Sequence, residues 1–218
     1  MTKRDLDNLE NLIDRLSQDS AWRKKELSDL KTLIESKSLS FGRHNAILRS
    51  GVTILYAHWE GFVKTSASSY LEFVAMQKLR YEELSSNFVA LAMKAKLDQA
   101  METNKPTIFT EVTEFIMTKM AERSSIPYKN VIKTGSNLSS SILREIICIL
   151  GLDYSFFETK QVIIDEKLLK NRNTIAHGEY LLLDREAYLE LHSQVIEMMD
   201  NFRTQIENCA AMKSYSRK

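Results

Sequence analysis

The sequence predicts an all-α fold, and three observations lead to that prediction. Only 6 Gly and 2 Pro occur among 218 residues, although these two types usually make up about 12% of a protein. Strong helix formers such as Leu, Lys, Glu, Ala and Met are plentiful. Apolar residues recur at intervals of three and four along most of the chain, which is the period of an amphipathic helix. A chain of this length forms one ordinary core, so we expect a single domain over residues 1–218.

A long helix is expected at the N-terminus, as one helix or two in line. We treat residues 1–38 as a helical extension and residues 39–213 as the core bundle. Leucines at helical spacing are typical of a packed core or a coiled-coil seam, and the pattern leaves open whether the extension packs on the bundle or reaches to another subunit. The apolar positions on which this prediction depends are Leu6, Leu9, Ile13, Leu16, Leu27, Leu30, Leu33 and Ile34.

The most apolar stretch, residues 41–76, predicts the central and most buried helix. Three polar residues interrupt it: His58, Glu60 and Lys64. Glu60 and Lys64 are four residues apart, so they share one face of a helix and can form an exposed ion pair beside a partly buried histidine. The alternative is that one of these groups points toward a polar site elsewhere in the chain.

Further helices are expected near residues 85–101 and 107–121, with Pro106 leading into the second. Residues 122–137 are the least regular part of the chain, and we expect a loop or an insertion there. Its cationic residues, Arg123, Lys129 and Lys133, are solvated charges or a local cationic patch.

The C-terminal part carries clear helix boundaries. Ser136 or Asn137 is the expected N-cap of a helix that Gly151 ends. A short helical turn is expected at residues 153–158, followed by a helix from about 160 to 177. Asp184 is the expected N-cap of the last helix. The basic tail from Lys213 is expected to fray.

Net charge and cysteine content restrict the class of protein. The net charge of +1 gives no overall field toward nucleic acid or membrane, so any polyanion must bind to a local patch. Cys148 and Cys209 lie in apolar surroundings without metal-ligand spacing, and we expect reduced, packed cysteines in a cytoplasmic protein. No run of about 18 apolar residues and no hydrophobic leader occurs, so no membrane association is expected.

One polar segment lies at a joint between two apolar helical patterns and predicts a functional site. It combines a permanent cation, Arg172, with a titratable imidazole, His177, and ends at a glycine. On a regular helix these two residues are about 140° apart and roughly 7 to 8 Å apart along the axis. Either the helix distorts near its end, or two copies of the segment meet across a two-fold axis. The segment reads Lys170-Asn171-Arg172-Asn173-Thr174-Ile175-Ala176-His177-Gly178.

The residue types in this segment favour chemistry on a phosphate. It has no carboxylates for magnesium and no cysteine or second nearby histidine for zinc, so we expect no metal and no cofactor. Histidine transfers protons near neutral pH, and arginine binds phosphate through paired hydrogen bonds. These two roles are sufficient for metal-free cleavage of RNA, because RNA supplies its own nucleophile, the 2′-hydroxyl.

The same segment resembles the Arg-x4-6-His motif of the HEPN superfamily, all-α domains found in ribonucleases and in many prokaryotic toxin and phage-defence proteins. Arg172-Asn173 and Ala176-His177-Gly178 carry the resemblance. Residues 55–64, Leu-Tyr-Ala-His-Trp-Glu-Gly-Phe-Val-Lys, further resemble a subset of prokaryotic HEPN proteins. The likeness extends from about residue 40 onward, and the N-terminal helix and the 123–137 loop lie outside it.

The resemblance implies a helical bundle, a homodimer with the motif at its interface, and a metal-independent endoribonuclease that leaves a 2′,3′-cyclic phosphate. Arg172 would bind the scissile phosphate and His177 would act as general acid or base. Asn173 and Lys170 would orient the motif or bind RNA, with Glu60 and His58 in supporting roles. The implied partners are RNA, a second copy of the chain and an antitoxin or defence-system protein.

Two alternatives remain at this stage. The chain could be a catalytically inactive HEPN-like module that dimerises or binds RNA or protein, or a plain helical scaffold in which Arg172 is a surface residue and His177 a helix cap. A second arginine–histidine pair, Arg185 and His192, also satisfies the loosest form of the motif. It lies seven residues apart on one helix face without a following Asn or Gly, so we interpret that match as accidental.

Overall fold

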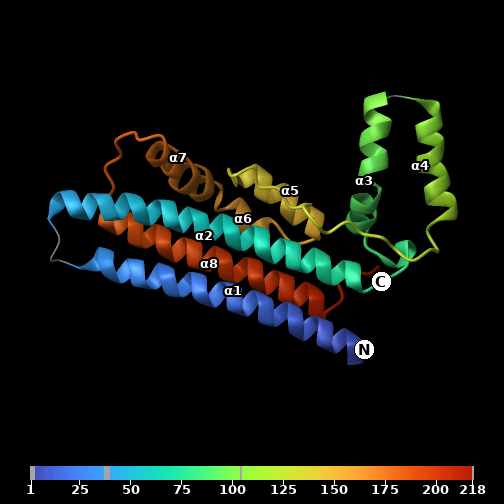
Figure 1. The fold of residues 1–218 in the computed structure, drawn as a ribbon, viewed down its shortest axis with the longest axis horizontal. Helices are drawn as coiled ribbons and strands as arrows, with labels where there is room; N and C mark the ends of the chain where they lie inside the picture. The colour runs from blue at the N-terminus through green and yellow to red at the C-terminus, as the bar shows by residue number, and fades with distance from the viewer. Residues whose placement is uncertain (1–2, 37–39, 104, 218) are drawn as a thin grey trace.

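The computed structural model describes residues 3–36, 40–103 and 105–217 and confirms the all-α prediction. Three long helices run side by side: α1 (Lys3–Glu35), α2 (Phe41–Met76) and α8 (Arg185–Ala211). Figure 1 shows the shorter elements on the α2 side of these three helices. Within the described ranges, β-structure is limited to two isolated bridges, Arg80–Arg123 and Leu84–Ser216. The predicted boundary at residue 38 lies outside the described residues.

The shorter elements lie against α2 or project from its end (Figure 1). A 3-10 turn, η1 (Tyr81–Glu83), leads into a projecting hairpin of α3 (Ser86–Thr103) and α4 (Pro106–Thr118). A non-helical segment, residues 119–139, then returns to the bundle. It is followed by α5 (Ser140–Leu150), α6 (Ser155–Glu158), the π-helix η2 (Ile163–Lys170) and α7 (Asn171–Ala176).

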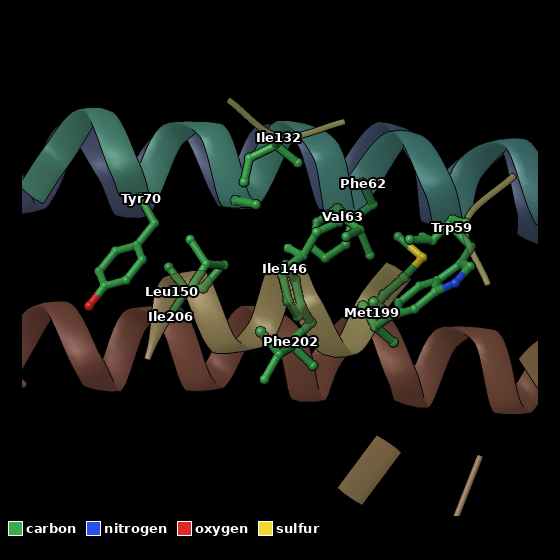
Figure 2. Close-up of a cluster of buried hydrophobic side chains, with 14 of the residues drawn as sticks. Trp59, Phe62, Val63, Tyr70, Ile132, Ile146, Leu150, Met199, Phe202 and Ile206 are labelled. Carbon is green, nitrogen blue, oxygen red and sulfur yellow. The ribbon is translucent and has the colours of Figure 1, made fainter. Parts of the chain in front are cut away.

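The core lies where α2, α5 and α8 meet. Figure 2 shows Trp59, Phe62, Val63 and Tyr70 of α2 facing Ile146 and Leu150 of α5 and Met199, Phe202 and Ile206 of α8. Each of these side chains is buried, and each fully buried aliphatic or aromatic group stabilises the fold by about 1.5–3 kcal/mol. The helix that the composition marked as most apolar is therefore the centre of the bundle.

The N-terminal helix α1 belongs to this bundle. Leu12, Leu16, Leu27 and Ile34 are buried, and α1 contacts both α2 and α8. Three of them, Leu16, Leu27 and Ile34, are among the positions that predicted this helix, whereas Leu6 and Leu33 are exposed. One face of α1 therefore packs and the opposite face stays in solvent. None of the helices within the described ranges is both long enough and apolar enough to cross a membrane.

Most helix boundaries follow the local signals in the sequence. Pro106 occupies the first turn of α4, and Gly151 ends α5 in the left-handed conformation with a φ of 68°. Asp184 caps α8 by accepting a hydrogen bond from the backbone N–H of Ala187 at 3.3 Å. The N-cap of α5 is Ser139, whose hydroxyl accepts from the Ile142 N–H at 3.2 Å.

Three expectations about helix caps, the C-terminal tail and cysteine burial were wrong. Neither Ser136 nor Asn137 caps α5, because both belong to a turn that contacts another helix, described below. The C-terminal tail does not fray: Tyr215 is buried and its carbonyl accepts a 2.9 Å hydrogen bond from the Ser85 N–H. Cys148 is exposed on α5 and is not a packed residue, whereas Cys209 is half-buried.

Candidate functional site

The polar segment 170–178 forms the end of the π-helix η2, the whole of α7 and the turn that ends it. Gly178 has a φ of 77° and donates its N–H to the carbonyl of Ile175 at 3.1 Å. The Glu179 N–H bonds the carbonyl of Thr174 at 3.1 Å, which completes a Schellman motif. The glycine at which the segment ends therefore terminates the helix, and it does so in the left-handed conformation.

The sequence predicted a helix from about residue 160 to 177. The part of it that leads into the segment is not a regular α-helix. Residues Ile163–Lys170 form a π-helix, a rare conformation that is frequent at functional sites. It buries Ile164 and Leu168 against the core. On another side it places Asp165 at the start of α5, where its carboxylate accepts hydrogen bonds from the Ser140 N–H at 2.7 Å and the Ser140 hydroxyl at 2.5 Å.

Arg172 lies against α2 and against the turn that precedes α5. Its guanidinium carbon is 4.2 Å from the centre of the Tyr56 ring, which is close enough for a cation–π contact. Its Nη2 donates to the carbonyl oxygen of Ser136 and, at 3.3 Å, to Oδ1 of Asn137. Its Nε is buried without a hydrogen-bond partner among the described residues.

Asn137 joins both polar residues of the motif. Besides the bond from Arg172, its Oδ1 accepts one from Nδ2 of Asn173 at 3.3 Å. The turn is closed by a hydrogen bond from the Asn137 N–H to the Thr134 carbonyl at 3.1 Å and places Ser136 at a φ of 56°. The next residue, Leu138, donates its N–H to the Tyr56 hydroxyl at 2.6 Å.

Charges around this cluster leave the arginine available to an anion. Arg172 forms no ion pair with any carboxylate in the part of the chain that the structure describes. Both oxygens that accept hydrogen bonds from its Nη2 are neutral. Burial raises the pKa of the Tyr56 hydroxyl, and a hydrogen bond with Glu60 raises it further, whereas Arg172 acts in the opposite direction. Tyr56 is therefore neutral at pH 7 and can accept from Leu138 and donate to Glu60.

His177 lies at the opposite, exposed end of the segment. It is the C-cap of α7, and its N–H bonds the carbonyl of Asn173 at 2.9 Å. Residues 171–176 are α-helix, and on a regular helix the directions of Arg172 and His177 differ by about 140°, so the two side chains leave the segment in different directions. Lys170 forms an exposed ion pair with Glu166 at 2.7 Å, a contact of small energy.

The structure places Glu60 beside the hydroxyl of Tyr56, the ring that contacts Arg172, whereas His58 lies on another side of α2. His58 is two residues beyond Tyr56, about 200° around α2, and it faces α1. Its Nε2 is 3.1 Å from the Glu26 carboxylate and its ring meets Trp22 edge-on. Burial lowers the pKa of His58, and this effect exceeds the upward effect of Glu26. A supporting role for His58 at the 170–178 segment does not fit this position.

The histidine of the second arginine–histidine match is buried between α8 and α1. His192 is 9% exposed on α8, where it faces Leu27 and Lys31 of α1, and burial lowers its pKa. Arg185 lies seven residues earlier, at the start of the same helix. A buried histidine between two helices cannot reach a large substrate, so the interpretation of this match as accidental agrees with the structure.

A groove of about 500 Å³ runs between the first half of α2 and α7. Its wall includes Arg49, whose Nη2 donates to the Glu179 carbonyl at 2.9 Å, just beyond the motif. Ile175 of α7 forms the opposite side. The groove is open to solvent and lies along α2 beside the segment. Among the described residues, no three His, Cys, Asp or Glu side chains gather as a metal site.

Sequence reasoning missed three residues of this site: Tyr56, Asn137 as a contact residue, and Asp165. Tyr56 lies in an apolar run and carries no signal that separates it from core tyrosines. Asn137 is in the irregular segment, where helical periodicity gives no information on contacts. The available signal in the sequence was the turn-forming pair Gly135-Ser136. In the structure these two residues have positive φ values, 62° and 56°, and form the turn.

Comparison with known protein families gives one finding. Residues 12–215 match the family model described as HEPN_MAE_28990, MAE_28990-like HEPN. The match includes most of α1 and the whole 119–139 segment, the two parts for which the sequence motifs alone gave no likeness. A search of curated proteins and a search of solved structures returned no match.

Proposed function

The chain belongs to the MAE_28990-like HEPN family, and from that premise we propose that it is a metal-independent endoribonuclease of the toxin or phage-defence type. Its substrate is RNA, and Arg172 and His177 carry the reaction. The observation that supports this most is the state of Arg172, a guanidinium held in place by neutral oxygens with its positive charge unpaired among the described residues. A charge held in this way suits a phosphate.

The proposed reaction is an internal transfer at phosphorus. The 2′-oxygen of the RNA attacks the adjacent phosphorus as a base takes its proton, and the bond to the 5′-oxygen breaks as an acid protonates that oxygen. The products are a 2′,3′-cyclic phosphate and a 5′-hydroxyl. His177 acts as the base or the acid, and Arg172 stabilises the negative charge on the phosphate oxygens.

The active unit we propose is a homodimer. Arg172 and His177 are about 140° apart on regular helix, and two copies of the segment across a two-fold axis would bring both groups into one cleft without distortion of α7. The position of His177 at a helix C-terminus agrees with this, because the helix end repels a phosphate unless further cations are near. Lys170 and Asn173 then contact the RNA backbone. A cytoplasmic location and an antitoxin or defence-system partner belong to the same proposal.

The test is cleavage of mixed tRNA and mRNA by the purified protein in EDTA, beside the Arg172→Ala and His177→Ala variants. We expect cleavage by the wild type, with cyclic-phosphate ends, and a loss of about 100-fold or more in either variant. Arg185→Ala is the matched control, because that arginine belongs to the accidental motif, and it should cleave normally. Circular dichroism checks that all variants fold.

The same experiment separates the enzyme from a binding module. Equal background from wild type and variants would contradict catalysis. If the wild type nevertheless binds RNA and Arg172→Ala does not, the chain is an RNA-binding HEPN module. If no RNA binds at all, the segment is structural.

A further inference from the structure

We infer that Tyr56 and Asn137 are positioning residues that hold the Arg172 guanidinium, and with it Asn173, in the orientation that meets the scissile phosphate. This inference rests on the proposed function and adds two residues that the Arg/His motif does not contain. Neither residue is assigned chemistry of its own, and both act through Arg172.

Tyr56 supports the guanidinium from one face. Its ring lies 4.2 Å from the Arg172 guanidinium carbon, and its side chain is buried on the central helix α2. The hydroxyl of the same ring accepts the Leu138 N–H at 2.6 Å. One rigid side chain thus fixes both the plane of the guanidinium and the turn that bonds its edge, and small errors in such a position cost large factors in rate.

Asn137 fixes the edge of the guanidinium. A single oxygen, Oδ1, accepts from Arg172 Nη2 and from Asn173 Nδ2, each at 3.3 Å. The Ser136 carbonyl takes a further bond from Nη2. An arginine has five N–H donors in a fixed plane; these bonds engage Nη2, and in the proposed complex Nη1 donates to the phosphate.

The turn is built as a support and not as a cover that must open. Thr134 and Leu138 on either side of it are buried, at 5% and 0% exposure. Ser140 is held through two hydrogen bonds to Asp165, which lies in the same helical stretch that carries Arg172. The turn and the motif are therefore tied together on both sides of their contact.

The neutrality of Asn137 is part of the inference. An aspartate at this position would keep an acceptor oxygen, but its charge would pair with the guanidinium and compete with the phosphate. Asn137→Asp should therefore weaken the binding of RNA, although it preserves the contact between the turn and α7.

The experiment measures kcat and KM for cleavage of one short RNA by Asn137→Ala and Tyr56→Phe. We expect kcat to fall by about 10- to 100-fold, with a smaller change in KM. Two matched controls lose equivalent bonds away from the motif. Tyr81→Phe loses a hydroxyl that accepts the Ser125 N–H at 3.0 Å in the same 119–139 segment, and Asn87→Ala loses a 2.8 Å bond to the Ile149 carbonyl. Both controls should keep the wild-type kcat.

A double variant tests whether Asn137 acts through Arg172. In an Arg172→Ala background, Asn137→Ala should cause a much smaller loss of cleavage than in the wild type, because the arginine is gone and only Asn173 remains to be held. An additive loss would overturn the inference, and so would a wild-type kcat in Asn137→Ala and Tyr56→Phe. A wild type that cleaves no RNA would overturn the proposed function itself, and that result does not depend on residues 56 or 137. RNA binding by Asn137→Asp at the wild-type level would contradict the role given to the neutral amide.

Discussion

Gly178 determines how the motif ends. It has a φ of 77°, and a Cβ added there would meet no atom within 4 Å, so any cost of substitution comes from the backbone alone. An L-residue in the left-handed conformation costs about 1–2 kcal/mol. We predict that Gly178→Ala lowers the free energy of unfolding by about 1 kcal/mol and reduces RNA cleavage, because the preceding His177 shifts. Urea denaturation and the cleavage assay measure both effects.

Gly42→Ala is the control for this prediction. Gly42 also has open space around its Cα, but it lies in the first turn of α2 with a helical conformation. Alanine is the better helix former there, so stability should stay level or rise by up to about 1 kcal/mol. An equal loss of stability in both variants would contradict the explanation from the helix end.

Residue type alone was enough to propose Arg172, Asn173 and His177 as candidate site residues, because a cation, an amide and an imidazole at a helix joint are unusual in a core. It could not identify Tyr56, which looks like every other aromatic residue of the central helix. The difference between Tyr56 and His58 depends on helix phase: two positions apart, they face different helices, and only the packing of α1 and α7 shows which one reaches the site.

Gly51 in α2 lies where three helices approach one another closely, so a side chain has little room there. A Cβ at this position would lie 2.7 Å from Cε2 of Tyr188 on α8 and 3.0 Å from Cδ1 of Ile34 on α1. The gain in helix propensity is about 1 kcal/mol, whereas overpacking of a core costs about 1–3 kcal/mol. We predict that Gly51→Ala lowers the free energy of unfolding by about 1 kcal/mol, which urea denaturation measures as a lower midpoint.

A second substitution tests this cause. Tyr188→Leu removes the ring that meets the new methyl group most closely and leaves only the contact with Ile34, so Gly51→Ala should destabilise the protein less in that background. If the loss of stability is the same with and without the Tyr188 ring, the contact between α2 and α8 is not its source.

At the scale of elements, the sequence predicted the helices well where amphipathic periodicity is strong, as in α2 and α8. It failed at η2, because the apolar spacing of Ile164 and Leu168 fits an α-helix as well as the observed π-helix. It also failed for the turn at Ser136-Asn137. The contacts of that turn join residues 35 and 36 positions apart, and local propensity contains no information on such pairs.

Two buried histidines tie α1 to the rest of the molecule. His58 of α2 faces Glu26, Arg23 and Asp19 of α1, and His192 of α8 faces the Leu27 carbonyl, Lys31 and Glu35. Burial is the largest cause of the lowered pKa in both. The ordinary pKa is about 6.5, so between that value and the lower folded pKa the unfolded chain binds more protons than the folded one.

The stability of the whole bundle should therefore be full above about pH 6.5 and should fall as the pH drops through the folded pKa values of these histidines. Urea unfolding between pH 7.5 and pH 5 measures this. The variant with both His58→Gln and His192→Gln should lose much of the pH dependence in that window, where Asp and Glu contribute little. A slope identical to that of the wild type would assign the effect to other groups.

The largest-scale prediction concerns the proposed dimer. If each active site takes Arg172 from one copy and His177 from the other, two inactive variants can complement each other. After subunits of Arg172→Ala and His177→Ala exchange at equal amounts, half of the dimers are mixed, and each mixed dimer has one intact site out of two. We predict recovery of about a quarter of the wild-type activity on this statistical basis.

Each variant alone, treated identically, should stay inactive. Mass spectrometry of intact dimers measures the subunit exchange. If subunits exchange but activity does not recover, each site draws Arg172 and His177 from the same chain. The 140° between the two residues would then have to be closed by distortion of α7 when RNA binds.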